Sequence, residues 1–180
     1  QDAFDTNWVV PLGPNVNGFE KDLESFVGQD KKVVALSAGT AAVHLALLDC
    51  DVKAGDEVMV QSFTFCASSN PIKYLGAKPV FVDSEKETWN MDPQLLDKAI
   101  ADRIEKTGKK PKAIIVVYLY GMPAKIDEIL QVANKYDIPL IEDAAEKWQA
   151  LTLLGAKYAS GHAAACEEEI RQQIARTVLL

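Results

Sequence analysis

Three short segments of this sequence follow apolar runs, and each carries residue types that can bind a ligand. They are residues 37–42 (SAGTAA), 62–67 (SFTFCA) and 142–146 (EDAAE). In a parallel α/β sheet, ligands bind at the carboxyl ends of the strands. If the apolar runs form such strands, the three segments belong to one binding site.

The first segment, residues 37–42, has the small residues of a turn that leads from a strand into a helix. Backbone N–H groups at a helix N-terminus have no partner within the helix, and with the Thr40 hydroxyl beside them they can bind a phosphate. A simpler interpretation is a tight turn capped by Thr40, and the segment taken alone favours it. A phosphate site therefore needs support from the rest of the sequence.

The other two segments have residues that can bind a flat, protonated ring. Phe63 and Phe65 can stack on a heterocycle, although a place in the hydrophobic core is the commoner use of such residues. Asp143 follows the apolar run 138–141, and a carboxylate there is costly without a partner. The N–H of a pyridinium ring is one such partner, and the N-terminus of a helix capped by Asp143 is another.

Histidines and cysteines do not indicate a metal site. The histidines, His44 and His162, are far apart, and the cysteines, Cys50, Cys66 and Cys166, show no ligand spacing. His44 falls inside a predicted helix and His162 in a glycine-containing break. An odd number of cysteines with no export signal favours free thiols in a reducing compartment, so we expect a cytoplasmic protein.

Alternating strands and helices are predicted to position the three segments. Strands are expected at residues 32–36, 57–61, 79–82, 113–119 and 138–141, and helices at 40–48, 65–75 (broken or bent near Pro71), 93–104 (capped by Asp92) and 126–136. This is the order of βαβ units. The sequence therefore predicts an α/β fold in which helices flank a mostly parallel sheet.

Composition and charge exclude several classes of protein. The chain has 180 residues, of which 48% are hydrophobic and 25% charged, as in ordinary globular domains. Its net charge of −7 repels phosphates on average, so we expect no nucleic-acid partner and no anionic-membrane partner. No apolar run approaches the ~20 residues that span a bilayer.

The alternation of strands and helices stops after Glu146. Residues 147–180 place apolar residues such as Ile170 and Ile174 at helical spacing and show no further strand. We therefore expect two parts, an α/β portion at residues 1–146 and a helical tail of uncertain origin at residues 147–180.

Together, the segments resemble the DegT-type (DegT/DnrJ/StrS) sugar aminotransferases, which are pyridoxal-phosphate enzymes of fold type I. The matching stretches are residues 8–14 (WVVPLGP), 37–47 (SAGTAAVHLAL), 55–58 (GDEV), 63–65 (FTF), 76–83 (GAKPVFVD), 90–93 (NMDP), 119–121 (LYG) and 141–146 (IEDAAE). Each motif alone is weak, but their shared order along residues 1–146 makes the resemblance specific.

The resemblance implies a binding site for pyridoxal 5′-phosphate in the portion 1–146. The residues that it assigns to the cofactor are Gly39, Thr40, Ala41, Phe65, Asp143, Ala145 and Glu146. The first three would hold the phosphate, Phe65 would stack on the pyridine ring, and Asp143 would pair with the ring nitrogen. Ala145 would pack on the opposite face of the ring, and Glu146 would lie near its phenolic oxygen.

The resemblance also implies substrates and partners. Members of this family transfer an amino group, usually from glutamate, to a keto carbon of a nucleotide-linked sugar. Residues 8–15 would lie near the nucleotide-sugar site. Relatives complete each active site with residues of a second subunit, so we expect a homodimer or a chain prone to association.

The sequence departs from the family pattern after Glu146. Relatives carry a Schiff-base lysine beyond this point. Lys147 and Lys157 come too early in the sequence to match it and lack its neighbouring residues. Some relatives have a histidine in place of this lysine, but His162 also comes too early and lacks the expected neighbours. We therefore expect a fragment without the catalytic lysine, inactive as given. A truncated or frame-shifted gene, a chimera or engineered chain, and a natural non-catalytic derivative would each explain the tail. The alternative function is a non-catalytic α/β binding or structural protein with a helical interaction tail.

Overall fold

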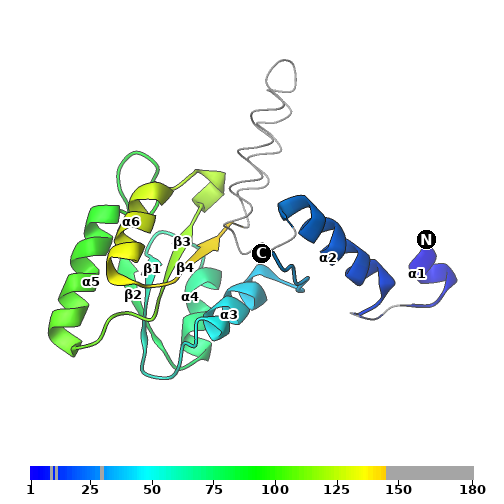
Figure 1. The fold of residues 1–180 in the computed structure, drawn as a ribbon, viewed down its shortest axis with the longest axis horizontal. Coiled ribbons are helices and arrows are strands. Elements are labelled where there is room, and N and C mark those ends of the chain that lie inside the picture. Colours follow the sequence, from blue (N-terminus) through cyan, green and yellow to red (C-terminus); the bar gives the residue numbers. More distant parts are fainter. Residues whose placement is uncertain (9, 11, 29–30, 145–180) are drawn as a thin grey trace, which may run out of the picture.

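A computed structural model describes residues 1–8, 10, 12–28 and 31–144 of the chain (Figure 1). Four strands form one sheet in the order β2-β1-β3-β4. They are β1 (Glu57–Gln61), β2 (Lys78–Val82), β3 (Ala113–Val117) and β4 (Leu140–Asp143). Every neighbouring pair is parallel, so all four strands end at the same edge of the sheet. The predicted α/β fold with a parallel sheet is confirmed.

The described part of the chain also contains six α-helices and one short 3-10 turn. They are α1 (Asp2–Asp5), α2 (Pro14–Val27), α3 (Gly39–Asp49), α4 (Cys66–Tyr74), α5 (Pro93–Thr107), the short 3-10 turn η1 (Leu119–Gly121) and α6 (Ile126–Tyr136). Figure 1 shows α5 and α6 on one side of the strands and α3 and α4 on the other, with α1 and α2 set apart from the sheet.

The alternation of side chains along each strand supplies one core to each face. Val58 and Ile115 pack with α3 and α4, while Met59 and Ile114 pack with α5 and α6. All five residues of β3 are buried, which explains its unbroken apolar sequence. Each large aliphatic side chain buried in this way contributes roughly 1.5–3 kcal/mol relative to exposure.

Local signals set both ends of α5, and the sequence predicts the first of them. The Asp92 carboxylate accepts hydrogen bonds from the backbone N–H groups of Gln94 (2.7 Å) and Leu95 (3.1 Å). The helix ends at Gly108, whose φ of 69° lies in the left-handed region that favours glycine. The helix therefore begins where predicted and runs three residues beyond the expected end, residue 104.

The strand expected at residues 32–36 is a wrong prediction. The structure assigns no strand there, so the described sheet has four strands rather than the expected five. The backbone N–H groups of Val33 and Ala35 instead donate to the carboxylates of Glu24 (3.3 Å) and Glu20 (2.8 Å) on α2. These bonds hold the segment against α2, away from any strand.

The helix expected at residues 65–75, broken or bent near Pro71, is not broken, because α4 continues through this buried proline. Among the described helices, none combines the length and apolar content needed to cross a membrane.

The tail 147–180, with Ala145 and Glu146 before it, lies outside the described residues. The expectations for the tail and for these two cofactor residues therefore stay predictions.

Candidate functional site

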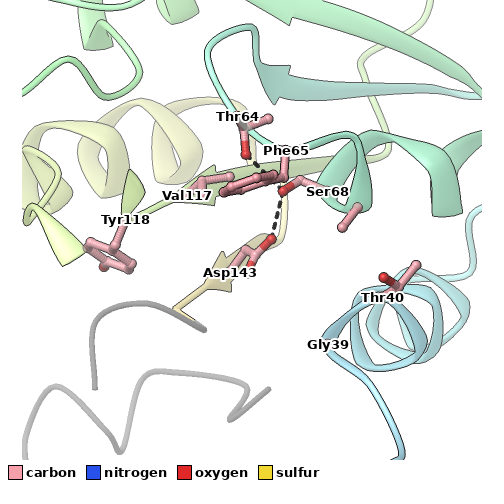
Figure 2. Close-up of a pocket in the computed structure, with 9 residues that line it drawn as sticks. Gly39, Thr40, Thr64, Phe65, Ser68, Val117, Tyr118 and Asp143 are labelled. Atoms are coloured by element: carbon pink, nitrogen blue, oxygen red, sulfur yellow. Dashed lines mark hydrogen bonds between the residues drawn. The ribbon is translucent and has the colours of Figure 1, made fainter. Parts of the chain in front are cut away.

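A pocket of about 200 Å³ lies at the carboxyl edge of the sheet (Figure 2). Its lining residues come from the start of α3, the loop after β1 with the first turn of α4, and the ends of β3 and β4. They are Gly39, Thr40, Thr64, Phe65, Ala67, Ser68, Val117, Tyr118 and Asp143. The three segments that the sequence singled out therefore meet in one place.

The N-terminus of α3 faces this pocket, and no described residue accepts a hydrogen bond from its first two backbone N–H groups. Ala38 is the N-cap residue, no side chain caps the helix, and its first turn contains no acidic residue. The N–H of Ala41 already donates to the Ala38 carbonyl (3.0 Å), and Ala41 is not among the lining residues. The N–H groups of Gly39 and Thr40 precede the first bonds of the helix and are therefore suited to an anion.

The interpretation of Thr40 as a helix cap is therefore wrong. Thr40 lies inside α3, one residue after its start, and the capping position belongs to Ala38 in extended conformation (φ −161°, ψ 150°). Because Ala38 has no polar side chain, it leaves the end of the helix uncapped. An uncapped helix end beside a pocket is a more favourable anion site than a capped one.

Asp143, the last residue of β4, projects into the same pocket. One carboxylate oxygen, Oδ2, accepts a hydrogen bond from the Ser68 hydroxyl at 2.7 Å. The Ser68 and Thr64 hydroxyls lie 3.0 Å apart. Figure 2 shows these three side chains in a row beside the Phe65 ring, with Gly39 and Thr40 on the facing helix.

The aromatic residues near the pocket are exposed, which rules out the alternative that they belong to the hydrophobic core. Phe65 is 57% exposed and contacts the edge of Tyr120, with ring centroids 6.3 Å apart. Phe63 is 49% exposed and makes a similar contact with Trp89 at 6.2 Å. Phe65 immediately precedes α4, and this position places its ring at the mouth of the pocket rather than in either core.

A buried amide pair, which the sequence did not reveal, joins the loops that carry these aromatic residues. Gln61 and Asn90 are both fully buried. Gln61 Nε2 donates to the Phe63 carbonyl (2.8 Å) and to Asn90 Oδ1 (3.2 Å). Asn90 Oδ1 also accepts from the Leu119 N–H (3.1 Å), and its Nδ2 donates to the Met122 carbonyl (2.8 Å).

A second buried group fixes the loop that leads to Asn90. Burial of Glu85 acts to raise its pKa. This effect is outweighed by hydrogen bonds that the carboxylate accepts from the Thr88 hydroxyl, from the backbone N–H groups of Glu87 and Thr88, and from Lys125. They lower the pKa of Glu85 from 4.5 to about 2. Lys125 Nζ lies 3.3 Å from this carboxylate, and so ties the loop to the start of α6.

Glu142, the neighbour of Asp143, has a different environment. It is buried, and its carboxylate accepts a hydrogen bond from the Tyr118 hydroxyl. Burial, and then the charge of Glu142, raise the pKa of Tyr118 well above its usual value, so this phenol stays a neutral donor. Figure 2 shows the Tyr118 ring turned away from Asp143. Of the two carboxylates, therefore, Asp143 is the one that faces the pocket.

The remaining sequence candidates lie elsewhere. His44 makes an edge contact with Tyr74 (ring centroids 5.8 Å apart) on the helices behind the pocket. No group of metal-ligating side chains occurs in the described part of the chain. Cys50 and Cys66 are free thiols, as expected, and His162 is outside the described residues.

Sequence reasoning missed Ser68, Gln61 and Asn90. A signal existed for Gln61, because it is a polar residue at the end of an apolar strand run. Ser68 and Asn90 carry no comparable local signal, since their partners lie 75 and 29 residues away in the sequence.

Comparison with known proteins identifies the family of this chain. The model of the DegT/DnrJ/EryC1/StrS aminotransferase family matches residues 1–166, which extends past the last quoted motif. EpsN of Bacillus subtilis (strain 168) is 52% identical over 145 residues, covering 81% of this chain and 37% of EpsN. The UDP-2-acetamido-2-deoxy-3-oxo-D-glucuronate aminotransferase of Pseudomonas aeruginosa is 44% identical over 139 residues, covering 77% of this chain and 36% of the relative.

Solved structures agree with these sequence matches. A DegT DnrJ EryC1 StrS aminotransferase from Brucella abortus superposes with a TM-score of 0.73 at 36% identity, covering 80% of this chain and 38% of that structure. NtdA from Bacillus subtilis with bound cofactor PMP gives a TM-score of 0.67 at 34% identity, covering 74% of this chain and 29% of NtdA. This chain thus spans about a third of its relatives' length. It belongs to the DegT/DnrJ/EryC1/StrS aminotransferase family.

Proposed function

We propose that residues 1–146 form the cofactor-binding portion of a pyridoxal-phosphate-dependent aminotransferase that acts on a nucleotide-linked keto sugar, with an amino acid such as glutamate as donor. The observation that carries the proposal is the pocket itself, which joins an uncapped helix N-terminus, an exposed aromatic ring and a strand-end carboxylate. The sugar-nucleotide aminotransferase from Pseudomonas aeruginosa and the PMP-bound NtdA support it by similarity.

The residues present fit this cofactor. The N–H groups of Gly39 and Thr40, with the Thr40 hydroxyl, would bind the phosphate. Phe65 would stack on one face of the pyridine ring and exclude water from it. Asp143 would accept the ring N–H, and this partner would offset the cost of a partly buried carboxylate. The bound cofactor would then supply its usual chemistry, an electron sink for the amino-acid carbon.

We further propose that the 180-residue chain binds the cofactor without a covalent bond and does not turn over. No lysine occurs among the described residues that line the pocket. Lys147 and Lys157 follow Asp143 in the sequence but lie outside the described residues. Transamination needs an amine that both holds the cofactor and moves a proton beside the ring, and the described lining offers none.

Binding can be tested with pyridoxamine 5′-phosphate, because its amine cannot react with surface lysines as an aldehyde would. We expect saturable binding in isothermal titration calorimetry, at one molecule per chain. Asp143→Ala should abolish it, whereas Asp127→Ala, which removes an exposed carboxylate on α6, should not. Absence of saturable binding would overturn the proposal and favour a non-catalytic α/β domain.

Covalent attachment has a separate test. The chain is incubated with pyridoxal phosphate, reduced with borohydride and digested for peptide mapping by mass spectrometry. We expect only scattered, substoichiometric labelling of surface lysines. Stoichiometric labelling at Lys157 that Lys157→Ala removes would contradict non-covalent binding.

We also propose that the chain self-associates. Phe63, Phe65, Trp89 and Tyr120 are all exposed at the carboxyl edge, and exposed apolar surface of this kind favours association. Light scattering at rising protein concentration should show dimers or larger species, and a constant monomer mass would contradict this expectation.

A further inference from the structure

We propose that Ser68 is a positioning residue for the cofactor: its hydroxyl orients the Asp143 carboxylate so that one defined oxygen faces the ring nitrogen. This inference rests on the proposed cofactor and goes beyond it, because it assigns the orientation of the carboxylate to a residue that would not itself touch the ring nitrogen.

The geometry defines the direction of each hydrogen bond. Ser68 Oγ lies 2.7 Å from Asp143 Oδ2, and an ionised carboxylate can only accept, so Ser68 uses its single hydroxyl proton there. The neighbouring hydroxyls of Thr64 and Ser68 lie 3.0 Å apart. Since the Ser68 proton is already committed, Thr64 is the donor to Ser68. The order is therefore Thr64 to Ser68 to Asp143.

This chain of hydrogen bonds leaves the second oxygen of the Asp143 carboxylate, Oδ1, available to a ligand. Among the described residues, no hydrogen bond is made to Asp143 Oδ1, so this oxygen is left to accept an N–H from a ligand. The terminal torsion of an aspartate side chain is soft and roughly two-fold. Without the bond from Ser68, the carboxylate would sample orientations in which neither oxygen points along the ring N–H.

The position of Ser68 also explains why the hydroxyl is well placed. Ser68 is 2% exposed in the first turn of α4, and its backbone N–H donates to the Phe65 carbonyl at 3.1 Å. The start of α4 therefore carries both the Phe65 ring, which would stack on the cofactor, and the Ser68 hydroxyl, which would orient the Asp143 carboxylate toward the ring nitrogen. Movement of this turn would disturb both contacts together.

The test compares two ligands that differ only at the ring nitrogen: pyridoxamine 5′-phosphate and its 1-deaza analogue, in which carbon replaces that nitrogen. Dissociation constants are measured by calorimetry for the 180-residue chain and for Ser68→Ala. We expect Ser68→Ala to weaken pyridoxamine phosphate about 10-fold, the loss typical of a hydrogen bond that involves a charged group. Its affinity for the deaza analogue should stay unchanged.

Two further variants separate positioning from folding. Ser69→Ala removes the adjacent hydroxyl, which donates to the Cys66 carbonyl, and should leave the ratio of the two affinities unchanged. Thr64→Val breaks the outer hydrogen bond but keeps the one from Ser68 to Asp143, and should weaken pyridoxamine phosphate selectively, about threefold. Because Thr64 also lines the pocket, the deaza analogue measures any effect of the changed lining. If Ser68→Ala fails to unfold cooperatively in urea, Thr64→Val decides the question.

The outcomes distinguish this inference from the proposed function. Failure of the unsubstituted chain to bind pyridoxamine phosphate would overturn both. Binding that Ser68→Ala or Thr64→Val weakens equally for the two ligands would show a purely structural role, and would overturn the positioning role alone. Selective loss with pyridoxamine phosphate supports it.

Discussion

Glu57 begins β1 and Gln61 ends it, and the two ends of this strand have different surroundings. At the amino edge, the Glu57 carboxylate makes two hydrogen bonds to Arg103 of α5, at 2.7 and 2.8 Å. At the carboxyl edge, Gln61 is buried in an amide network beneath exposed aromatic rings. The Glu57 charge at the amino edge is therefore paired within the protein. The carboxyl edge, in contrast, keeps Asp143 Oδ1 and the N-terminus of α3 available to a ligand.

The comparison shows how this fold separates stability from binding. An ion pair such as Glu57–Arg103 stabilises the sheet but offers nothing to a ligand. The Gln61–Asn90 pair stabilises as well, yet its hydrogen bonds end on the loops that carry Phe63 and Leu119. Changes at the amino edge should thus affect folding alone, and changes in the buried network should affect both properties.

Asn90→Ala should have the largest effect on stability. It leaves the buried Leu119 N–H, and the carbonyl of the half-exposed Met122, without the partners that Asn90 supplies, and a buried unsatisfied group costs about 1–3 kcal/mol. We expect the free energy of unfolding in urea to fall by about 3 kcal/mol. Affinity for pyridoxamine phosphate should fall too, because two loops at the pocket are loosened.

Asn134→Ala is the matched control for this variant. It removes the same side chain from an exposed position on α6, and surface substitutions usually change stability by less than about 0.5 kcal/mol. Equal urea midpoints for Asn90→Ala and Asn134→Ala would show that the buried network does not stabilise the carboxyl edge.

Glu57→Ala should come next, with a loss of about 2 kcal/mol in the free energy of unfolding, since it removes two charge-assisted hydrogen bonds from a largely buried pair. Glu57→Gln, which keeps one acceptor oxygen, should lose less. Neither variant should change the dissociation constant of pyridoxamine phosphate. A weaker affinity in either would break the proposed separation of the two edges.

The fold was largely predictable because its signals are local. The apolar run of β3, the Asp92 cap of α5 and the helical spacing of α6 each lie within one short stretch. The error at residues 32–36 has a physical cause: the stretch is apolar enough for a strand, but the carboxylates of Glu20 and Glu24 bind its backbone donors. Sequence pattern does not reveal such competition.

The site was predictable only in part. Asp143 ends β4 at the carboxyl edge of the parallel sheet, where ligands bind in such folds, as the sequence predicts. Gly39 and Thr40 line the same pocket although no strand precedes them, so their place was predicted for a reason that the structure does not support. Ser68 was not predictable, since its role depends on a hydrogen bond across 75 residues of sequence. The exposure of Phe65 also depends on tertiary structure, because an aromatic residue before a helix is equally compatible with a core position.

The next effect in size concerns Glu85 and pH. Its folded pKa of about 2 lies below the ordinary value of 4.5, so its contribution is complete above about pH 5 and is lost as the pH falls toward 2. Between pH 5 and pH 3, the unsubstituted chain should lose up to about 2 kcal/mol more stability than Glu85→Gln does. Urea unfolding across this range measures the difference.

Glu105→Gln is the control for this variant. It lies at an exposed position of α5 and should keep the pH dependence of the unsubstituted chain. If all three proteins lose stability in parallel as the pH falls, Glu85 is not the source of the pH dependence.

The smallest effect on stability belongs to a residue with a large expected effect on binding. Phe65 is 57% exposed, so Phe65→Ala removes little buried surface and should change the free energy of unfolding by less than about 0.5 kcal/mol. Stacking of an aromatic side chain on a heterocycle contributes about 1–3 kcal/mol, so affinity for pyridoxamine phosphate should fall by about 5-fold to 150-fold. Phe81→Ala is a close control, because Phe81 is 56% exposed on the edge strand β2 and does not line the pocket. It should leave the dissociation constant unchanged. If both variants bind equally well, Phe65 is merely another exposed aromatic residue, and the carboxyl edge loses one of the three contacts that distinguish it from the amino edge.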